Sequence, residues 1–280
     1  MKIGANSFVW TDSFGVNNFD VLARIADAKL DGIEIGILNP YDFPAKQVRS
    51  ELNRLGLGCT TCCVLPPDAS LIANEEESRK KARTHIAACL EATAELGGEL
   101  VCGPLYAPVG KFTGVRRTAD EWDRAVEGWQ ELAPVAQKLN VEVAIEPLNR
   151  FETYFLNTTA DAVKFCDEVG NSSVGILIDT FHANVEEKNI GEALKVAGSH
   201  LKHVHSCEND RGIPGTGTIH WDIFFKAIKE IGYDRWMVIE SFGFSLGMLS
   251  AAASIWRDLA PNPEDIPFEG AKFLRKELAR

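Results

Sequence analysis

The chain has 280 residues, 45% of them hydrophobic, a formal net charge of -11 and a pI of about 5.1. This length can bury one large core, and an acidic surface repels nucleic acids and anionic membranes, so neither is expected as a partner. No stretch approaches the roughly 18 apolar residues of a membrane span, and the residues after Met1 lack the apolar core of a signal peptide. The composition is typical of a cytoplasmic enzyme.

Strand-like and helix-like patterns alternate along the chain. The predicted strands cover residues 3–10, 32–37, 57–65, 100–106, 141–146, 174–179, 201–205 and 236–240. The predicted helices cover residues 18–30, 45–55, 75–96, 119–139, 159–169, 190–197, 221–231, 246–259 and 268–278. Gly56 and Gly97 stand where two of these helices are expected to stop.

Eight strand–helix units call for a parallel sheet, and in this length they favour a closed (β/α)8 TIM barrel. We expect one domain over residues 1–280, with terminal helices after the eighth strand. The alternative is an open, doubly wound sheet. That fold would place a glycine-rich phosphate turn after the first strand, but Ser-Phe-Val-Trp stands at residues 7–10.

The seven cysteines are an odd number for a disulfide framework. We expect reduced, mostly buried thiols in a reducing compartment. The pair Cys59-x-x-Cys62 has the spacing of a redox or zinc motif. However, it lies inside a strand-like run, and no second pair completes a zinc site, so we interpret it as structural.

The fifth to eighth predicted strands end in side chains that bind metals: Glu146, Asp179, His205 and Glu240. In a barrel the carboxyl ends of the strands converge on one mouth, where chemistry gathers. Three carboxylates and one imidazole suit manganese, magnesium, cobalt or zinc, and the lack of thiolates disfavours a structural zinc. Three carboxylates this close also need a cation, because they repel one another when all are ionised.

Four segments carry longer motifs: Ile-Glu-Pro-Leu-Asn-Arg-Phe-Glu at 145–152, Ile-Asp-Thr-Phe-His-Ala-Asn at 178–184, His-Val-His-Ser-Cys-Glu-Asn-Asp-Arg-Gly-Ile-Pro-Gly-Thr-Gly at 203–217, and Val-Ile-Glu-Ser-Phe at 238–242. In order and spacing, over nearly the whole chain, they resemble the ketose 3-epimerase family. That family includes D-tagatose, D-psicose (D-allulose) and L-ribulose 3-epimerases and belongs to the xylose isomerase-like barrels.

The resemblance implies a role for each matching residue. Glu146, Asp179, His205 and Glu240 would hold one divalent metal, with Mn²⁺ expected first and Co²⁺ or Mg²⁺ as alternatives. Glu146 and Glu240 would also form the acid/base pair. The residues expected to bind the oxygens of a small ketose substrate are Glu152, His182 and Arg211.

The chemistry explains why these residue types are needed. Inverting C3 of a free ketohexose or ketopentose requires removal of a proton next to the C2 carbonyl, which leaves negative charge on an enediolate oxygen. A metal stabilises that charge. One carboxylate takes the proton from one face of C3, and another returns a proton to the opposite face.

Three other functions stay open. An aldose–ketose isomerase or inosose-type dehydratase could use the same scaffold, although the paired glutamates with His182 and Arg211 favour the epimerase. A DNA endonuclease of this fold would want more than six histidines and a basic groove. A non-catalytic sugar-binding module would not need converging metal ligands.

Some residues near the expected mouth have two interpretations. Glu34 ends the second strand and either lies on the rim of the pocket or anchors a ligand from behind. His203 has the same strand parity as His205 and is expected to be a hydrogen-bonded histidine inside the barrel. Trp10 is either core or a wall of the sugar pocket, and Glu152 and Arg211 could instead form a salt bridge on the rim.

The apolar terminal helices and the resemblance predict a homodimer or homotetramer.

Overall fold

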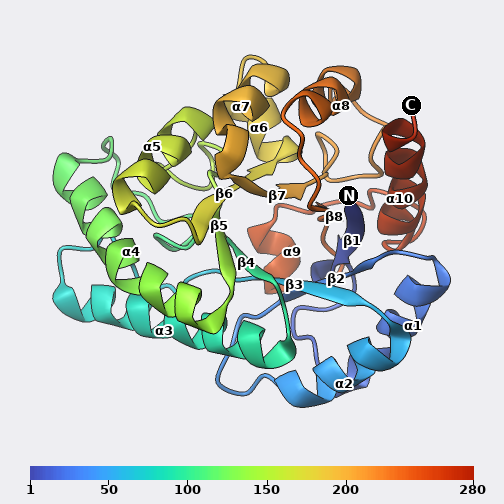
Figure 1. Cartoon of the computed structure of the whole chain (residues 1–280), viewed down its shortest axis with the longest axis horizontal. Coiled ribbons are helices and arrows are strands. Elements are labelled where there is room, and N and C mark those ends of the chain that lie inside the picture. Colours follow the sequence, from blue (N-terminus) through green and yellow to red (C-terminus); the bar gives the residue numbers. More distant parts are fainter.

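The computed structural model describes residues 1–280, and at its centre parallel strands close into an eight-stranded barrel in chain order (Figure 1). The strands are β1 (Lys2–Asn6), β2 (Gly32–Gly36), β3 (Gly58–Cys62), β4 (Leu100–Gly103), β5 (Glu142–Ile145), β6 (Val174–Asp179), β7 (Leu201–His205) and β8 (Trp236–Ile239). The barrel closes where β8 pairs with β1, with Ile3 opposite Met237. The predicted TIM barrel is confirmed.

Helices surround the strands (Figure 1). They are α1 (Phe19–Asp27), α2 (Ala45–Leu55), α3 (Glu76–Leu96), α4 (Ala119–Leu139), α5 (Thr159–Val169), α6 (Thr180–Glu186), α7 (Ile190–Ala197), α8 (Trp221–Glu230), α9 (Met248–Ala252) and α10 (Asp265–Leu278). The last helix packs against β1 and β8 and so covers the closing seam of the barrel. None of these helices combines the length and hydropathy that crossing a membrane would require.

Local sequence signals fix where the long helices begin and end. The Thr118 side chain accepts a hydrogen bond from the backbone of Glu121, whose carboxylate in turn accepts from the backbone of Thr118, which forms a capping box at the start of α4. Gly97 ends α3 with a φ of 80°, a left-handed conformation that costs glycine little. Inside α4, Trp122 and Trp129 are both buried.

The apolar core has two parts. The larger one, of 66 buried residues, lies between the strands and the helices. The smaller one lies inside the barrel and includes Cys62, Leu100, Cys102, Ala144 and Leu177. All seven cysteines are free and buried, as expected from the sequence.

A single tryptophan fills the amino-terminal end of the barrel. An ideal Cβ at Gly32 or Gly58 would lie 2.7 or 2.8 Å from the Trp236 ring, and one at Gly4 would lie 3.3 Å from it. Real Cβ contacts are rarely this short, so the missing side chains on β1, β2 and β3 make the space that the indole occupies. Trp236 is therefore buried at the bottom of the barrel, where its Nε1 donates to Glu99 at 3.1 Å.

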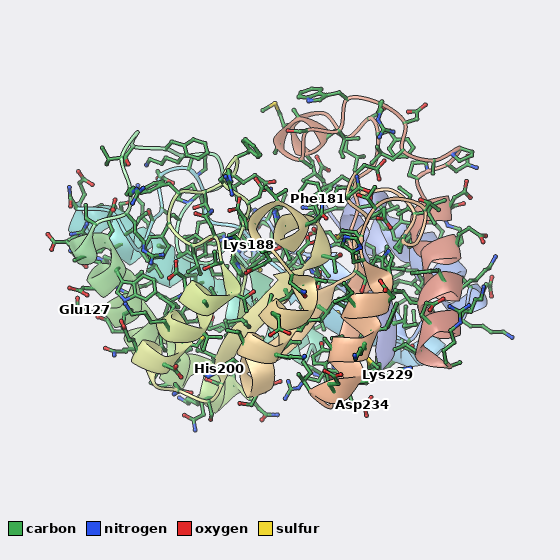
Figure 2. The ribbon with its side chains drawn as sticks, turned by 90° about the horizontal axis from the view of Figure 1, so that it is seen from above. Glu127, Phe181, Lys188, His200, Lys229 and Asp234 are labelled. Carbon is green, nitrogen blue, oxygen red and sulfur yellow. The ribbon has the colours of Figure 1, made fainter.

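The carboxyl ends of the strands lie at the opposite side. In Figure 2, Phe181, which follows β6, is near the upper side of the molecule, whereas Asp234, just before β8, is at the lower edge. The mouth of the barrel therefore faces upward in that view, under the chain that contains α9.

The structure corrects several predicted boundaries. The first strand ends at Asn6, whose side chain accepts a hydrogen bond from the Phe8 backbone, and Ser7–Val9 form a 3-10 turn instead of more strand. The predicted strands 57–65 and 100–106 stop at Cys62 and Gly103. The predicted helix 246–259 is reduced to α9, and α6 was not predicted.

Candidate active site

The four predicted metal ligands meet at the mouth of the barrel. Asp179 and His205 are the last residues of β6 and β7, while Glu146 and Glu240 directly follow β5 and β8. One ligand atom from each lies within 4.8 Å of all the others, and the four residues are only 1 to 8% exposed. The closed barrel thus brings together side chains that are up to 94 positions apart in the sequence, from residue 146 to residue 240.

His205 is oriented for binding a cation. Its Nε2 lies 2.7 Å from a carboxylate oxygen of Glu34, so this nitrogen carries a proton and donates it. Its Nδ1 is buried with no hydrogen-bond partner and faces Glu240 at 3.5 Å, Glu146 at 3.9 Å and Asp179 at 3.9 Å. An unpartnered imidazole nitrogen among three carboxylates fits a divalent ion bound by oxygen and nitrogen ligands.

Arg211 approaches the cluster from the loop after β7. Its Nη1 donates to Asp179 at 2.8 Å and also pairs with Glu240. The guanidinium carbon lies 4.2 Å from the ring centroid of Phe181 and 5.2 Å from that of Phe242. Two aromatic rings therefore hold the guanidinium beside the carboxylates, which favours a positively charged group at this place.

His182, in the first turn of α6, presents a donor to the same cluster. The backbone N–H of Asn149 donates to its Nδ1 at 3.1 Å, and the Asn149 side-chain amide lies 2.9 Å from the same atom. Because a backbone N–H can only donate, Nδ1 is the unprotonated nitrogen and we assign the proton to Nε2. That Nε2 lies 3.6 Å from a carboxylate oxygen of Glu146 and 3.3 Å from Nη2 of Arg211, which is itself a donor, so of these two neighbours only Glu146 can accept its proton.

Glu152 lies in the loop after β5, next to these groups. It accepts a hydrogen bond of 2.8 Å from the side chain of Asn149, which links it to His182. The possible rim salt bridge between Glu152 and Arg211 does not form, since Arg211 pairs with Asp179 and Glu240 instead. The structure thus places all seven predicted site residues around one mouth.

The environments of the two glutamates differ. Burial raises the pKa of the Glu146 carboxyl well above its ordinary value, with Glu240 and Asp179 adding to this and His205 opposing it. Burial acts in the same direction on Glu240, but the charges of His205 and Arg211 outweigh it and hold its pKa at about 2. Among the protein groups alone, Glu146 therefore favours the acid form and Glu240 the base form.

The pKa values of the two site histidines, His182 and His205, are also shifted, in opposite directions. Burial lowers the pKa of His182 well below its ordinary value, and the charge of Arg211 adds to the effect. For His205 burial acts in the same direction, but Glu34 and Glu240 outweigh it and raise the pKa well above normal. A metal ion would therefore compete with a proton for His205.

Sequence reasoning missed Glu208, a fully buried residue in the loop that carries Arg211. Its carboxylate accepts from the backbone of Gly215 at 2.8 Å, the backbone of Ile219 at 2.9 Å and the indole of Trp221 at 2.9 Å. The sequence signal that could have identified Glu208 is a glutamate in a glycine-containing loop that ends at a tryptophan.

Trp10 packs against Phe268 of α10, with the two ring centroids 6.1 Å apart, and its Nε1 lies 3.3 Å from a carboxylate oxygen of Glu264.

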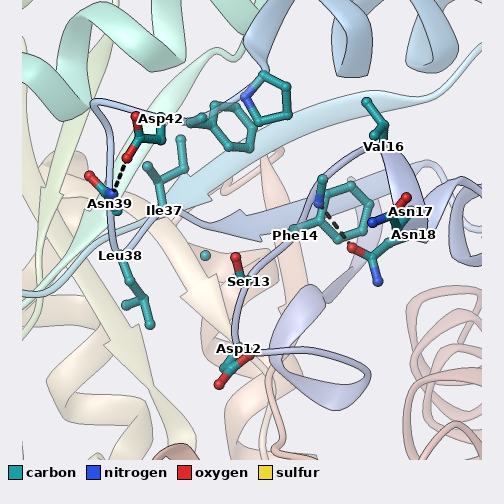
Figure 3. Close-up of a pocket in the computed structure, with 14 residues that line it drawn as sticks. Asp12, Ser13, Phe14, Val16, Asn17, Asn18, Ile37, Leu38, Asn39 and Asp42 are labelled. Atoms are coloured by element: carbon teal, nitrogen blue, oxygen red, sulfur yellow. Dashed lines mark hydrogen bonds between the residues drawn. The ribbon is translucent and has the colours of Figure 1, made fainter.

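A cavity lies between the loops that follow β1 and β2 (Figure 3). It has a volume of about 630 Å³, and its lining includes Asp12, Phe14, Asn17, Leu38 and Asn39. None of the seven predicted residues lines it, so this cavity and the candidate chemistry are separate features of the molecule.

Comparison with known proteins agrees with this geometry. Residues 22–277 match the family model described as xylose isomerase-like TIM barrel. The chain belongs to the xylose isomerase-like TIM barrel family. Within that family it is similar to ketose 3-epimerases, and its relatives are epimerases, so the protein is an enzyme of the isomerase class.

Three relatives illustrate the similarity. A protein of Synechocystis sp. named "Probable ketose 3-epimerase" is 33% identical over 276 residues, which cover 99% of this chain and 96% of that one. The D-psicose 3-epimerase of Ruminiclostridium cellulolyticum is 31% identical over 271 residues, covering 95% and 92% of the two chains. A crystal structure of D-allulose 3-epimerase from Methylomonas sp. superposes with a TM-score of 0.94 at 28% identity, covering 99% and 98%.

Proposed function

We propose that this enzyme inverts the configuration at C3 of free ketohexoses or ketopentoses. We propose further that it depends on a divalent metal ion, with Mn²⁺ as the expected ion and Co²⁺ or Mg²⁺ as alternatives. The observation that carries the proposal is the buried cluster of Glu146, Asp179, His205 and Glu240. These residues would hold the ion, whose positive charge would stabilise the enediolate oxygen formed when the C3 proton leaves.

The two glutamates are proposed to move the proton. Glu146 and Glu240 follow β5 and β8, on either side of the two strands that supply Asp179 and His205. They can therefore face opposite sides of a sugar held at the mouth. One carboxylate removes the proton from C3, and the other carboxyl returns one to the other face, with the roles exchanged in the reverse reaction.

Three further residues are proposed to bind the sugar. His182 Nε2–H and the Arg211 guanidinium are donors buried beside the cluster, so they suit the carbonyl and hydroxyl oxygens near C2 and C3. Glu152 can accept from a sugar hydroxyl. The small ketose is the only ligand proposed besides the metal, and neither nucleic acid nor membrane is a proposed partner.

Solvent deuterium labelling tests the reaction. A ketose incubated with the metal-loaded enzyme in deuterium oxide should gain deuterium at C3 in both substrate and product, because each carboxyl exchanges its proton with solvent between transfers. NMR of the recovered sugars locates the label. The Glu240→Gln variant should lose the reaction in both directions.

The same experiment separates the rival functions. An isomerase working through a C1–C2 enediol would label C1 or C2 and form an aldose, and a dehydratase would eliminate water. Bound metal without any turnover on a panel of ketohexoses and ketopentoses would favour a sugar-binding module. Epimerisation at full rate by protein shown to be metal-free by elemental analysis would contradict the proposed metal dependence.

We also propose a homodimer or homotetramer in the cytoplasm. The segment around α9 supports association, because Met248 and Trp256 are 84% and 77% exposed there although both are large and apolar. Light scattering coupled to size-exclusion chromatography measures the mass directly. A monomer at micromolar concentration would contradict this part of the proposal.

A further inference from the structure

Glu34 is the most heavily hydrogen-bonded side chain inside the barrel. It lies in the middle of β2, is fully buried, and belongs to none of the motifs that identify the site. Asn6 Nδ2 donates to its Oε1 at 2.9 Å, and Thr60 Oγ1 donates to its Oε2 at 2.9 Å. The two barrel histidines share it as well, His205 through Oε1 and His203 through Oε2, each at 2.7 Å.

This arrangement dictates which nitrogen of each histidine carries a proton. An ionised carboxylate only accepts hydrogen bonds, so every group around Glu34 must be a donor. Both histidines therefore present Nε2–H to it. For His205 this leaves Nδ1 facing Glu146, Asp179 and Glu240, and Nδ1 is the buried nitrogen that no protein group satisfies.

We infer that Glu34 is the positioning residue of the metal site: it fixes the ring orientation and the tautomer of His205 from behind, so that Nδ1 is available to the cation. The inference rests on the proposed metal-dependent function. It assigns Glu34 an anchoring position inside the barrel instead of the rim position that the sequence left open. No contact of Glu34 with substrate is involved.

An isosteric amide would disturb this arrangement. Glutamine at position 34 offers one acceptor oxygen and one NH₂ group, while each carboxylate oxygen of Glu34 now faces one histidine N–H and at least one other donor. If its NH₂ faces His205, it meets the His205 N–H and the Asn6 amide, so His205 must rotate or move its proton to Nδ1, and a protonated Nδ1 cannot bind a metal. If its NH₂ faces His203 instead, His205 keeps only a neutral amide oxygen as acceptor, which holds its N–H less strongly than the carboxylate does.

A second metal is the alternative explanation of the same residues. Ligand atoms of Glu34, Cys102, His203 and His205 also lie within 4.8 Å of one another. Against a metal there, both Nε2 atoms already lie at hydrogen-bonding distance from Glu34, and the Cys102 thiol lies 3.3 Å from it. The structure thus favours a hydrogen-bonded anchor with one metal site per chain.

Cobalt titration tests the inference, because the visible absorption of Co²⁺ reports affinity, stoichiometry and ligand geometry together. Metal-free wild type, Glu34→Gln and Thr60→Val would be titrated with Co²⁺. Thr60→Val is the matched control, since it removes a hydrogen bond to the same carboxylate without touching the bond to His205. We expect one Co²⁺ per wild-type chain, about 10- to 100-fold weaker binding with an altered spectrum in Glu34→Gln, and near wild-type binding and spectrum in Thr60→Val.

Three other outcomes would contradict the inference, the proposed function or both. Equal affinity and identical spectra for wild type and Glu34→Gln would refute the positioning role while leaving the proposed function intact. Two Co²⁺ per wild-type chain, falling to one in Glu34→Gln, would replace the anchor by a second metal site. A wild type that binds no Co²⁺ would overturn both the inference and the proposed function.

One measurement needs no variant and so does not depend on folding of Glu34→Gln. ¹⁵N-histidine NMR of the wild type loaded with diamagnetic Zn²⁺ should show a protonated Nε2 on both His203 and His205. A proton on Nδ1 of His205 would refute the inference.

Discussion

The two carboxylate oxygens of Asp179 have different partners. Its Oδ1 accepts a hydrogen bond of 2.7 Å from the Phe181 backbone and so caps α6, while its Oδ2 pairs with Arg211 and faces His205. The cap turns the chain directly from β6 into a helix, and His182 then sits in its first turn. The local role as a cap and the proposed role as a ligand thus depend on different oxygens of one carboxylate.

This division allows the two roles to be tested separately. Asn at position 179 is a good helix cap, so Asp179→Asn should change the free energy of unfolding of the metal-free protein little through the cap. Its lost charge should weaken metal binding at least about tenfold, or about 1.4 kcal/mol. Elemental analysis and calorimetric titration measure the effect.

Arg211→Ala is the comparison variant. It should raise KM or lower kcat but retain near wild-type metal content, because Arg211 is proposed to bind the sugar. Loss of metal from Arg211→Ala as complete as that from Asp179→Asn would show that the roles have been assigned wrongly.

How far the site could be predicted depends on where each residue lies relative to a strand end. Glu146, Asp179, His205 and Glu240 stand where a strand pattern stops, and barrel topology alone makes such ends converge. Glu34 was expected to end its strand, but β2 continues to Gly36, so Glu34 lies inside the barrel and not at its rim. Its partners His203 and His205 lie about 170 positions further along the chain, and only closure of the barrel makes them neighbours.

At the level of elements, the loop between β7 and α8 is organised by Glu208. One carboxylate fixes the backbone at Gly215 and Ile219 and the indole of Trp221, so the loop is tied at several points. Arg211 lies within this loop with a φ of 66°, an uncommon conformation for a residue with a side chain. The hydrogen bonds of Glu208 therefore hold the strained turn that presents Arg211 to the cluster.

Glu208→Gln should loosen this loop. The amide cannot accept from all these donors, and a buried donor left without a partner costs about 1–3 kcal/mol. We expect a lower Tm and a higher KM for the ketose, with metal affinity near wild type because no ligand is moved. Asp222→Asn, an exposed change in the first turn of α8, is the control and should alter KM little. An unchanged KM in Glu208→Gln would contradict the role of the loop.

Elements were predicted well where the sequence pattern is long and less well where it is short. Eight strands and the long helices followed from hydrophobic periodicity and stop signals. The predicted helix 246–259 is interrupted because Gly247 and Ser254 adopt φ values of 59° and 56°, which a helix does not permit. The short helix α6 was missed because its cap is also the last residue of a strand.

For the molecule as a whole, the buried cluster couples stability to pH. In the metal-free protein the pKa values of His205 and Glu146 are raised in the folded state, so the folded chain binds protons that the unfolded chain has released. Their contribution is present below the unfolded pKa values and is lost as the pH rises through the folded ones. Metal-free protein should thus lose stability through His205 above pH ~6.5, the ordinary pKa of histidine, and through Glu146 already above pH ~4.3, the ordinary pKa of glutamate.

Metal binding should reverse this dependence. The ion displaces the protons of His205 and Glu146, so the increase in Tm on adding Mn²⁺ should grow between pH ~6 and ~8. For the same reason, activity should fall as the pH is lowered toward ~5. Differential scanning fluorimetry with and without Mn²⁺ at each pH measures the increase, with His205→Ala as the control. An increase in Tm that stays constant over this range would contradict the proposed competition between metal and protons.

The tryptophan at the base of the barrel has a kinetic consequence. With Trp236 against Gly4, Gly32 and Gly58, the barrel is a cup with one opening, not a tube with two. The starting sugar and its epimer would therefore leave by the route by which they entered, and neither could bind while the other is inside. Each turnover would then be sequential at the mouth: the product must leave completely before the next sugar can enter.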